Sequence, residues 1–408
     1  NNGSSGASVA MADTITDFQS NVDTLKLGFA GDGSSGTGNY VESASSVANY
    51  SEALLAANSA LATLNSTSAG AELYAFQYDS NSGYLFIDNN SDGVAEDLII
   101  LSGESSLVEI LEFEVDFVMA GIVGSAGLLP VIEAAKKGIY IGLANKESLV
   151  CSGNILKKIL INKKSKILPI DSEHNAIFQV FEGSNINEIE KIILTASGGP
   201  FRGKQKHELM NITPGEAVLH PNWEMGKKIS VDSATLMNKG LEFIEAHYLF
   251  DMPISKIEVL VHPQSIVHSC VEYSDGSVLA QMGTPDMKTP IAYALGYPKR
   301  ISAPIKKLDL AFLSDLSFQK PDNNTFPALN LAINAIKTGG SAPAILNASN
   351  EIAVGAFLEN KIPFLSITKI VDLTLNKSNI CEITSIEEVL DVDIRAREIA
   401  GKFIKLES

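Results

Sequence analysis

The chain has 408 residues, a formal net charge of −17 and three cysteines, Cys151, Cys270 and Cys381. This length predicts two or three domains, and the acidic charge argues against nucleic acid or an anionic membrane surface as a partner. The sequence has no run of about 18 apolar residues, so no membrane span is predicted. Widely spaced cysteines without a CxxC motif are typical of a reduced, cytoplasmic protein.

Residues 1–103 form an acidic segment that differs in composition from the rest of the chain. They hold 12 acidic residues against one lysine, whereas residues 104–408 hold 36 acidic and 30 basic residues. An Ala/Leu-rich run predicts a helix over 51–64, and aromatic-rich runs predict strands over 73–78 and 84–87. The segment is therefore expected to be β-rich, and it loosely resembles the C-terminal regions of secreted bacterial calcium-binding repeat proteins.

A run of carboxylate and amide side chains follows the second of these strands. Asp88, Asn90 and Asp92, with Gly93 after them, match the opening of a calcium-binding loop and predict a weak Ca²⁺ site. The twelfth position of that loop is Ile99, where a bidentate Glu is needed. An Asx-rich hairpin turn is therefore the favoured interpretation.

A glycine pattern over 31–36 matches GxGxxG after a predicted strand over 24–29. A dinucleotide fingerprint needs a helix N-terminus at the pyrophosphate, but the following residues delay the helix, and Asp32 would place a carboxylate there. A flexible loop is the favoured interpretation.

Strands and helices alternate after residue 103, which indicates βαβ units with a parallel sheet. The predicted strands cover 117–123 and 139–144, and the predicted helices cover 128–137 and continue from 148. Asn145, Lys146 and Glu147 follow the end of a strand, where open α/β sheets bind ligands. Without further support this triplet favours a helix cap.

Three carboxylates come from two predicted elements. Asp171 and Glu173 follow a predicted strand over 166–170, and their spacing on an extended chain puts both carboxylates on one side. Glu242 lies on a predicted helix. Oxygen ligands of this kind suit Mg²⁺ or Mn²⁺, although any single acid in such a pattern is more often a solvated surface charge.

Five motifs in this part of the chain, taken in order, resemble 1-deoxy-D-xylulose 5-phosphate reductoisomerase. They are Asp171 to Gln179, Ser197 to Arg202, His220 to Trp223, Lys228 to Thr235 and Met237 to Glu242. The resemblance extends from about residue 104 to residue 408. It implies an enzyme that rearranges the sugar phosphate 1-deoxy-D-xylulose 5-phosphate and reduces it with NADPH to 2-C-methyl-D-erythritol 4-phosphate.

The resemblance also implies roles for individual residues. The implied metal ligands are Asp171, Glu173 and Glu242. The implied catalytic residues are these three with Lys146 and His220. The implied substrate-binding residues are Lys146, Ser172, Glu173, Ser197, His220, Trp223, Ser233, Asn238 and Lys239, with a helix cap as the alternative for Ser233. The implied cofactor-binding residues are Asn145, Glu147 and Gly226, and Trp223 would lie on a lid over the substrate.

The expected fold class is α/β, with parts of different character along the chain. In order, the parts are the acidic β-rich segment over 1–103, a truncated parallel-sheet cofactor domain over 104–155, an α+β catalytic domain over 156–300, a linker over 301–322 and a C-terminal helical domain over 323–408. Strands are predicted over 257–261, 266–273 and 277–281, and the resemblance implies that their sheet pairs two subunits into a homodimer. The glycine-rich phosphate-binding turn with which the family's cofactor domain begins is missing from the N-terminal part of this sequence. The alternative function is therefore a chimeric protein that keeps the metal and sugar-phosphate site but lacks the NADPH anchor.

Overall fold

The computed structural model describes backbone elements in the first part of the chain and nearly all of the rest. The described residues are 13–15, 40–42, 50–65, 73–78, 82–88, 97–102, 111, 115–223, 225–313 and 315–407. The chain divides into two compact units. One holds Asn1–Ile122 and Leu129–Ile141, and the other holds Val123–Leu128 and Gly142–Ser408.

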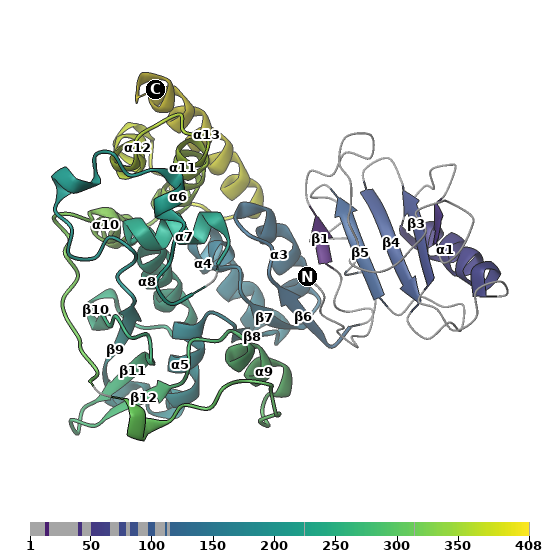
Figure 1. Cartoon of the computed structure of the whole chain (residues 1–408), viewed down its shortest axis with the longest axis horizontal. Coiled ribbons are helices and arrows are strands. Elements are labelled where there is room, and N and C mark those ends of the chain that lie inside the picture. The colour runs from purple at the N-terminus through teal and green to yellow at the C-terminus, as the bar shows by residue number, and fades with distance from the viewer. Residues whose placement is uncertain are drawn as a thin grey trace. The chain divides into compact units, whose positions relative to one another are not determined.

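The first unit contains a five-stranded sheet of order β1-β5-β4-β3-β2 (Figure 1). Strand β4 pairs antiparallel with both β3 and β5, while the edge strands β1 and β2 join in parallel. The elements are β1 (Asp13–Ile15), β2 (Tyr40–Glu42), α1 (Tyr50–Asn65), β3 (Leu73–Tyr78), β4 (Ser82–Asp88) and β5 (Asp97–Ser102). The helix predicted over 51–64 and the strands predicted over 73–78 and 84–87 are confirmed.

The predicted calcium loop falls largely outside the described residues. Asp88 is the last residue of β4, and Asn90 and Asp92 lie beyond it in the part that the structure leaves undescribed, as does the glycine pattern over 31–36. Both interpretations therefore stay predictions.

The predicted alternation of strands and helices after residue 103 is present, with shifted ends. The elements are β6 (Phe117–Ala120), η2 (Ser125–Gly127), α3 (Leu128–Lys136), β7 (Tyr140–Leu143), α4 (Lys146–Lys163), β8 (Lys166–Pro169) and α5 (Ser172–Val180). Strand β6 ends before Gly121, three residues earlier than predicted. Helix α4 starts earlier than predicted because Asn145 caps it, its side chain accepting a hydrogen bond from the backbone N–H of Ser148 at 2.9 Å.

A mixed sheet of order β10-β9-β11-β12 forms the centre of the second unit. Its strands are β9 (Ile189–Ala196), β10 (Ile257–Val261), β11 (Val267–Tyr273) and β12 (Val278–Met282). Strand β9 runs parallel to β10, with Leu194 opposite Val259, and antiparallel to β11, with Ile192 opposite Val271. Helix α5 packs on β11 and β12, and α8 (Met237–Leu249) packs on β9 and β10. Residues of β9 are buried along most of their length because helices cover the sheet.

The C-terminal part is helical, as predicted. Its helices are α10 (Ala328–Thr338), α11 (Ala342–Leu358), α12 (Phe364–Lys377) and α13 (Ile386–Glu407), shown in yellow-green to yellow in Figure 1. A capping box opens α13, since Ser385 and Glu388 each accept a backbone N–H from the other at 3.3 Å. None of the helices in the described residues is long and apolar enough to cross a membrane.

Candidate active site

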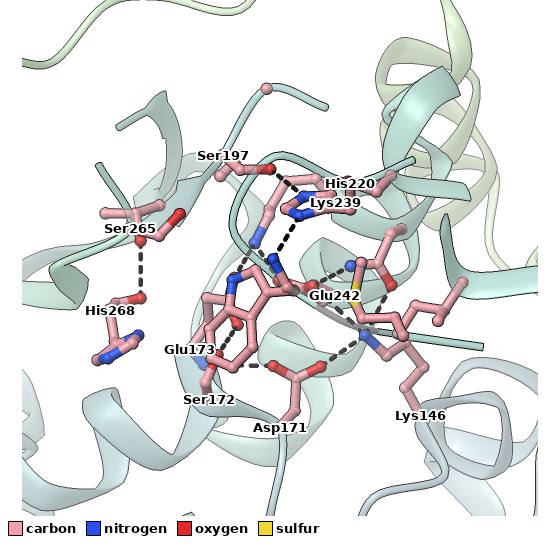
Figure 2. A pocket seen from close by; sticks show the side chains of 18 of the residues that line it. Lys146, Asp171, Ser172, Glu173, Ser197, His220, Lys239, Glu242, Ser265 and His268 are labelled. Atoms are coloured by element: carbon pink, nitrogen blue, oxygen red, sulfur yellow. Dashed lines mark hydrogen bonds and ion pairs between the residues drawn. The ribbon is translucent and has the colours of Figure 1, made fainter. Parts of the chain in front are cut away.

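A cavity of about 340 Å³ lies in the second unit where β8 and β9 end. All the predicted catalytic and substrate-binding residues line it, and Figure 2 shows most of their side chains pointing toward one another. They are Lys146, Asp171, Ser172, Glu173, Ser197, His220, Trp223, Ser233, Asn238, Lys239 and Glu242. The predicted cofactor residues Asn145, Glu147 and Gly226 are not among the lining residues.

The three predicted metal ligands meet at one point of this cavity. One oxygen each of Asp171, Glu173 and Glu242 lies within 4.8 Å of the other two. The spacing of Asp171 and Glu173 suggested that both lie on extended chain, and this is wrong. Asp171 instead caps α5 and accepts the backbone N–H of Glu173 at 3.2 Å, so the turn into the helix brings the two carboxylates together.

Two lysines neutralise most of this carboxylate charge. The ammonium of Lys146 lies 2.5 Å from Asp171 Oδ2 and 3.3 Å from Glu242 Oε1. Lys239 lies 2.8 Å from Glu173 Oε1 and also donates to Glu242 Oε2. Three convergent carboxylates held by cations are a donor set that fits a hard divalent ion such as Mg²⁺ or Mn²⁺.

Burial and neighbouring charges together shift the pKa values of two carboxyl groups of this cluster in opposite directions. Burial, with the charges of Asp171 and Glu173, raises the pKa of Glu242 to about 7. Burial alone would raise the pKa of Asp171 too, but Lys146 and His174 outweigh it and hold that pKa well below its ordinary value. The cluster therefore mixes a carboxylate that stays charged with one that protonates near neutral pH.

Ser197 and His220 form a hydrogen-bonded pair on another wall of the cavity. Nδ1 of His220 accepts the backbone N–H groups of Asn222 at 3.2 Å and Trp223 at 3.0 Å. The proton of the neutral ring is therefore on Nε2, which lies 2.8 Å from Ser197 Oγ and donates to it. Burial lowers the pKa of His220, so this neutral form is favoured near neutral pH.

The loop after Ser197 approaches helix α7 (Lys227–Thr235) closely. Gly199 has a φ of +68°, and a Cβ there would lie 2.7 Å from the backbone oxygen of Ser233. Ser233 lies inside α7, so the alternative role of a helix N-cap is wrong for it. Leu236, with a φ of 64°, separates α7 from α8. The glycine thus lets two predicted substrate-binding serines face the same cavity.

Asn238 and Lys239 contact the carboxylates in this structure. Asn238 donates to Glu242 Oε1 at 2.6 Å and accepts from the ammonium of Lys146 at 2.8 Å. Both residues line the cavity, so both have one side open to a ligand.

The structure adds His268 to the site, which sequence reasoning missed. His268 lines the cavity, is 6 % exposed, and its ring centroid lies 6.2 Å from that of Trp223. Its position in the strand predicted over 266–273 was the available signal, because a histidine inside a largely buried strand faces either core or ligand.

The predicted cofactor residues lie beside the cavity and mostly contact protein groups. Asn145 caps α4 and donates to the backbone oxygen of Gly124 at 2.8 Å. Glu147 is buried and accepts from Lys228 at 2.8 Å. At Gly226 a Cβ would meet nothing within 4 Å, so the backbone there is open to a close ligand. Gly226 therefore offers an open backbone contact, whereas the side chains of Asn145 and Glu147 are engaged with protein groups.

Comparison with known proteins places these observations in a family. The family model for 1-deoxy-D-xylulose 5-phosphate reductoisomerase matches residues 33–153, the model for its C-terminal domain matches 167–250, and the model for the DXP reductoisomerase C-terminal domain matches 282–399. The first match begins inside the acidic segment, and the predicted boundary at residue 103 stays a prediction.

Individual relatives agree with these models. The reductoisomerase of Thermodesulfovibrio yellowstonii is 51% identical over 310 residues, covering 76% of this chain and 81% of the relative. That of Chlorobium chlorochromatii is 54% identical over 290 residues, covering 71% and 76%. The solved structure of the Zymomonas mobilis reductoisomerase in complex with NADPH has a TM-score of 0.71 at 48% identity, covering 76% of this chain and 80% of that one. A DOX-P reductoisomerase in complex with NADPH, fosmidomycin and magnesium has a TM-score of 0.73 at 48% identity, covering 76% and 81%. The chain belongs to the 1-deoxy-D-xylulose 5-phosphate reductoisomerase family.

Proposed function

We propose that the cavity is the active site at which this chain isomerises 1-deoxy-D-xylulose 5-phosphate and reduces the rearranged aldehyde to 2-C-methyl-D-erythritol 4-phosphate. The observation that carries the proposal is the meeting of Asp171, Glu173 and Glu242 with two lysines and a Ser–His pair in one cavity. Such a site offers negative groups for a cation and positive or hydroxyl groups for an anionic sugar.

Asp171, Glu173 and Glu242 would hold Mg²⁺ or Mn²⁺. The bound ion supplies Lewis-acid polarisation of the substrate's carbonyl and hydroxyl oxygens. The ammonium groups of Lys146 and Lys239 contact the same carboxylates that would hold the ion. Both lysines would therefore leave these carboxylates when the ion binds and would turn toward the substrate. Ser172, whose Oγ donates to Glu173 at 2.6 Å, lies beside the same point and would bind a substrate oxygen.

The phosphate would lie where Ser197, Ser233, Asn238 and Lys239 face the cavity. Ser197 and Ser233 offer hydroxyls, Asn238 an amide and Lys239 an ammonium, all facing the cavity. A dianionic phosphate favours such donors, and the neutral His220 keeps Ser197 oriented through its Nε2–H. Trp223 would close over the substrate and exclude water during the rearrangement.

NADPH would supply the hydride beside Gly226, Asn145 and Glu147. The support is the open backbone at Gly226 and the NADPH in the titles of solved relatives. Asn145 and Glu147 would serve mainly by holding the turn that carries Lys146, since both side chains already have protein partners.

We further propose that the chain acts as a cytoplasmic homodimer on a small sugar phosphate. The support for pairing is β12, an edge strand of its sheet with Val278 52% and Leu279 42% exposed. An apolar edge strand is a surface that a second chain can cover.

The test is to mix the purified chain with 1-deoxy-D-xylulose 5-phosphate, Mn²⁺ and NADPH, and to monitor NADPH oxidation by its absorbance. We expect turnover that requires the metal and that Glu242→Gln abolishes. No turnover, with metal-dependent binding of fosmidomycin retained, would instead support the alternative of a substrate site without its reductant. Loss of both turnover and fosmidomycin binding would overturn the proposal.

A further inference from the structure

Helix α11 carries polar side chains into the packed interior of the second unit. Asn347 and Asn350 are fully buried there, although their neighbours on the helix are largely apolar. The helix packs against both α4 and α7, the two helices whose first turns flank the active site. Buried polar groups need specific partners, so the partners of this helix show what it holds in place.

Glu351 of α11 holds the turn between Gly124 and Ser125. Its Oε1 accepts the backbone N–H of Ser125 at 3.1 Å and the amide of Asn347 at 3.0 Å. Its Oε2 lies 2.5 Å from the guanidinium of Arg397 on α13, which also donates to Ser125 Oγ at 3.0 Å. A carboxylate and a guanidinium from two C-terminal helices therefore both hydrogen-bond to Ser125.

These contacts extend through Gly124 to Asn145, the residue before Lys146. Gly124 has a φ of +77°, and a Cβ there would lie 3.0 Å from Glu351 Oε1, so the carboxylate fills the space beside the glycine. The backbone oxygen of Gly124 accepts the amide of Asn145 at 2.8 Å, and Asn145 caps α4. The path runs from Arg397 through Glu351 and Gly124 to Asn145.

A second path from the same helix ends on the residue after Lys146. Asn350 donates to Asp232 Oδ1 at 2.7 Å, and Lys228 lies 3.0 Å from Asp232 Oδ2. Lys228 in turn donates to Glu147 at 2.8 Å. Adjacent residues of α11 thus reach both neighbours of Lys146 by separate chains of contacts.

We propose that Glu351, Arg397 and Asn350 are positioning residues that hold the Asn145–Lys146–Glu147 turn in the geometry that NADPH and substrate require. The inference rests on the proposed function of that turn. A partly buried ion pair such as Glu351–Arg397 adds little stability, but it fixes the orientation of its partners. The C-terminal helices would therefore contribute to the reaction without touching its reactants.

The test compares Glu351→Gln and Arg397→Gln with the control Arg395→Gln. Arg395 lies on α13, as Arg397 does, and its side chain is 63% exposed. For each protein, NADPH affinity is measured by NADPH fluorescence without substrate, Mn²⁺ affinity by titration calorimetry, and KM and kcat by turnover. We expect the changes at Glu351 and Arg397, whose side chains are 14% and 27% exposed, to weaken NADPH binding and raise its KM about tenfold. Mn²⁺ affinity should change by a clearly smaller factor than NADPH affinity, because the three carboxylates lie on α5 and α8 and only their contact with Lys146 depends on the turn. Arg395→Gln should change none of these quantities.

Two further variants separate positioning from general stability. The double variant Glu351→Gln with Arg397→Gln should cost little more in NADPH affinity than the worse single change, because both act through one turn. Arg397→Lys keeps the charge and should fall between wild type and Arg397→Gln, and it serves if Arg397→Gln does not fold. Unchanged NADPH affinity, or losses of NADPH and Mn²⁺ affinity in equal proportion, would overturn the positioning role. A wild-type chain without turnover or NADPH binding would contradict the proposed function itself, whereas a competent wild type with unaffected variants contradicts only this inference.

Discussion

The ammonium nitrogen of Lys146 lies 2.5 Å from Oδ2 of Asp171, and both side chains are at most 9% exposed. Burial would lower the pKa of Lys146, but Asp171, Glu242 and Glu245 outweigh it and raise that pKa well above its ordinary value. A charged lysine in contact with a predicted metal ligand means that cation binding must compete with, or displace, this ion pair.

Asp171→Asn removes a full negative charge from the predicted metal ligands. We expect Mn²⁺ affinity and kcat/KM each to fall at least about 100-fold, since changes even beyond the direct ligands cost 10- to 100-fold. Titration calorimetry and steady-state kinetics measure the two quantities. Asp251→Asn is the control, because that side chain is 70% exposed and pairs only at the surface with Lys157. Equal Mn²⁺ affinities of wild type and Asp171→Asn would remove Asp171 from the ligand set.

His174 should make the metal-free protein less stable as pH rises. Burial lowers the pKa of His174, but Glu245 and Asp171 outweigh it and raise the pKa to about 9. A raised folded-state pKa stabilises the protein fully below about pH 6.5, the ordinary value, and that stability is lost as pH rises through about 9.

Denaturant unfolding with a chelator present measures this effect. The unfolding free energy of wild type should decline between about pH 6.5 and 9, and His174→Gln should decline less. Parallel pH profiles for the two proteins would show that His174 is uncharged in the folded state.

Local sequence patterns predicted most elements, but their ends depended on side-chain caps. The strand over 73–78 and the helix over 51–64 follow from composition and periodicity alone, and both are present. Helix α4 begins two residues before its predicted start because Asn145 caps it, which confirms the helix cap favoured for the Asn145–Lys146–Glu147 triplet but not the start predicted from the apolar pattern. Capping depends on where one side chain points, which a pattern of apolar residues does not encode.

The site was predicted by motif resemblance and not by local geometry. The spacing of Asp171 and Glu173 suggested neighbours on extended chain, whereas they meet at the first turn of α5. No motif in the C-terminal helices pointed to the contacts that Glu351 and Arg397 make with Ser125. Contacts such as Arg397 to Ser125 join residues 272 positions apart, and no local pattern in one sequence reports them.

Trp223 should report ligand binding by its fluorescence. It is the single tryptophan of the chain and it lines the cavity next to His268. Fosmidomycin with Mn²⁺ should shift its emission to shorter wavelength, because covering the indole removes water from it. Trp223→Phe supplies the blank, and Mn²⁺ alone tests for an effect of the metal. An emission spectrum unmoved by saturating fosmidomycin would contradict a lid that closes over the ligand.

Ser197→Ala should weaken binding of the sugar phosphate selectively. The change removes one hydroxyl donor and leaves Nε2–H of His220 without its partner at 2.8 Å. We expect KM for the substrate to rise about 10- to 150-fold, the range for losing a hydrogen bond to a charged group, with Mn²⁺ affinity unchanged. Ser274→Ala, which lies in the turn between β11 and β12, is the surface control. A lower kcat at unchanged KM would instead give Ser197 a role in the chemical step.

Gly240→Ala should destabilise the contact between α8 and α10. A Cβ at Gly240 would lie 2.6 Å from the Cβ of Ala332, so one helix must shift. Overpacking of this kind costs about 1–3 kcal/mol and exceeds the gain of about 1 kcal/mol from replacing a helical glycine. Gly355→Ala in α11 is the matched control, because a Cβ there meets nothing within 4 Å, and it should stabilise the protein slightly. Denaturant unfolding of the two variants should therefore move in opposite directions from wild type. A gain in stability for Gly240→Ala would mean that α8 and α10 can separate at little cost, and that Glu242, two residues along α8, is held by its own contacts and not by this packing.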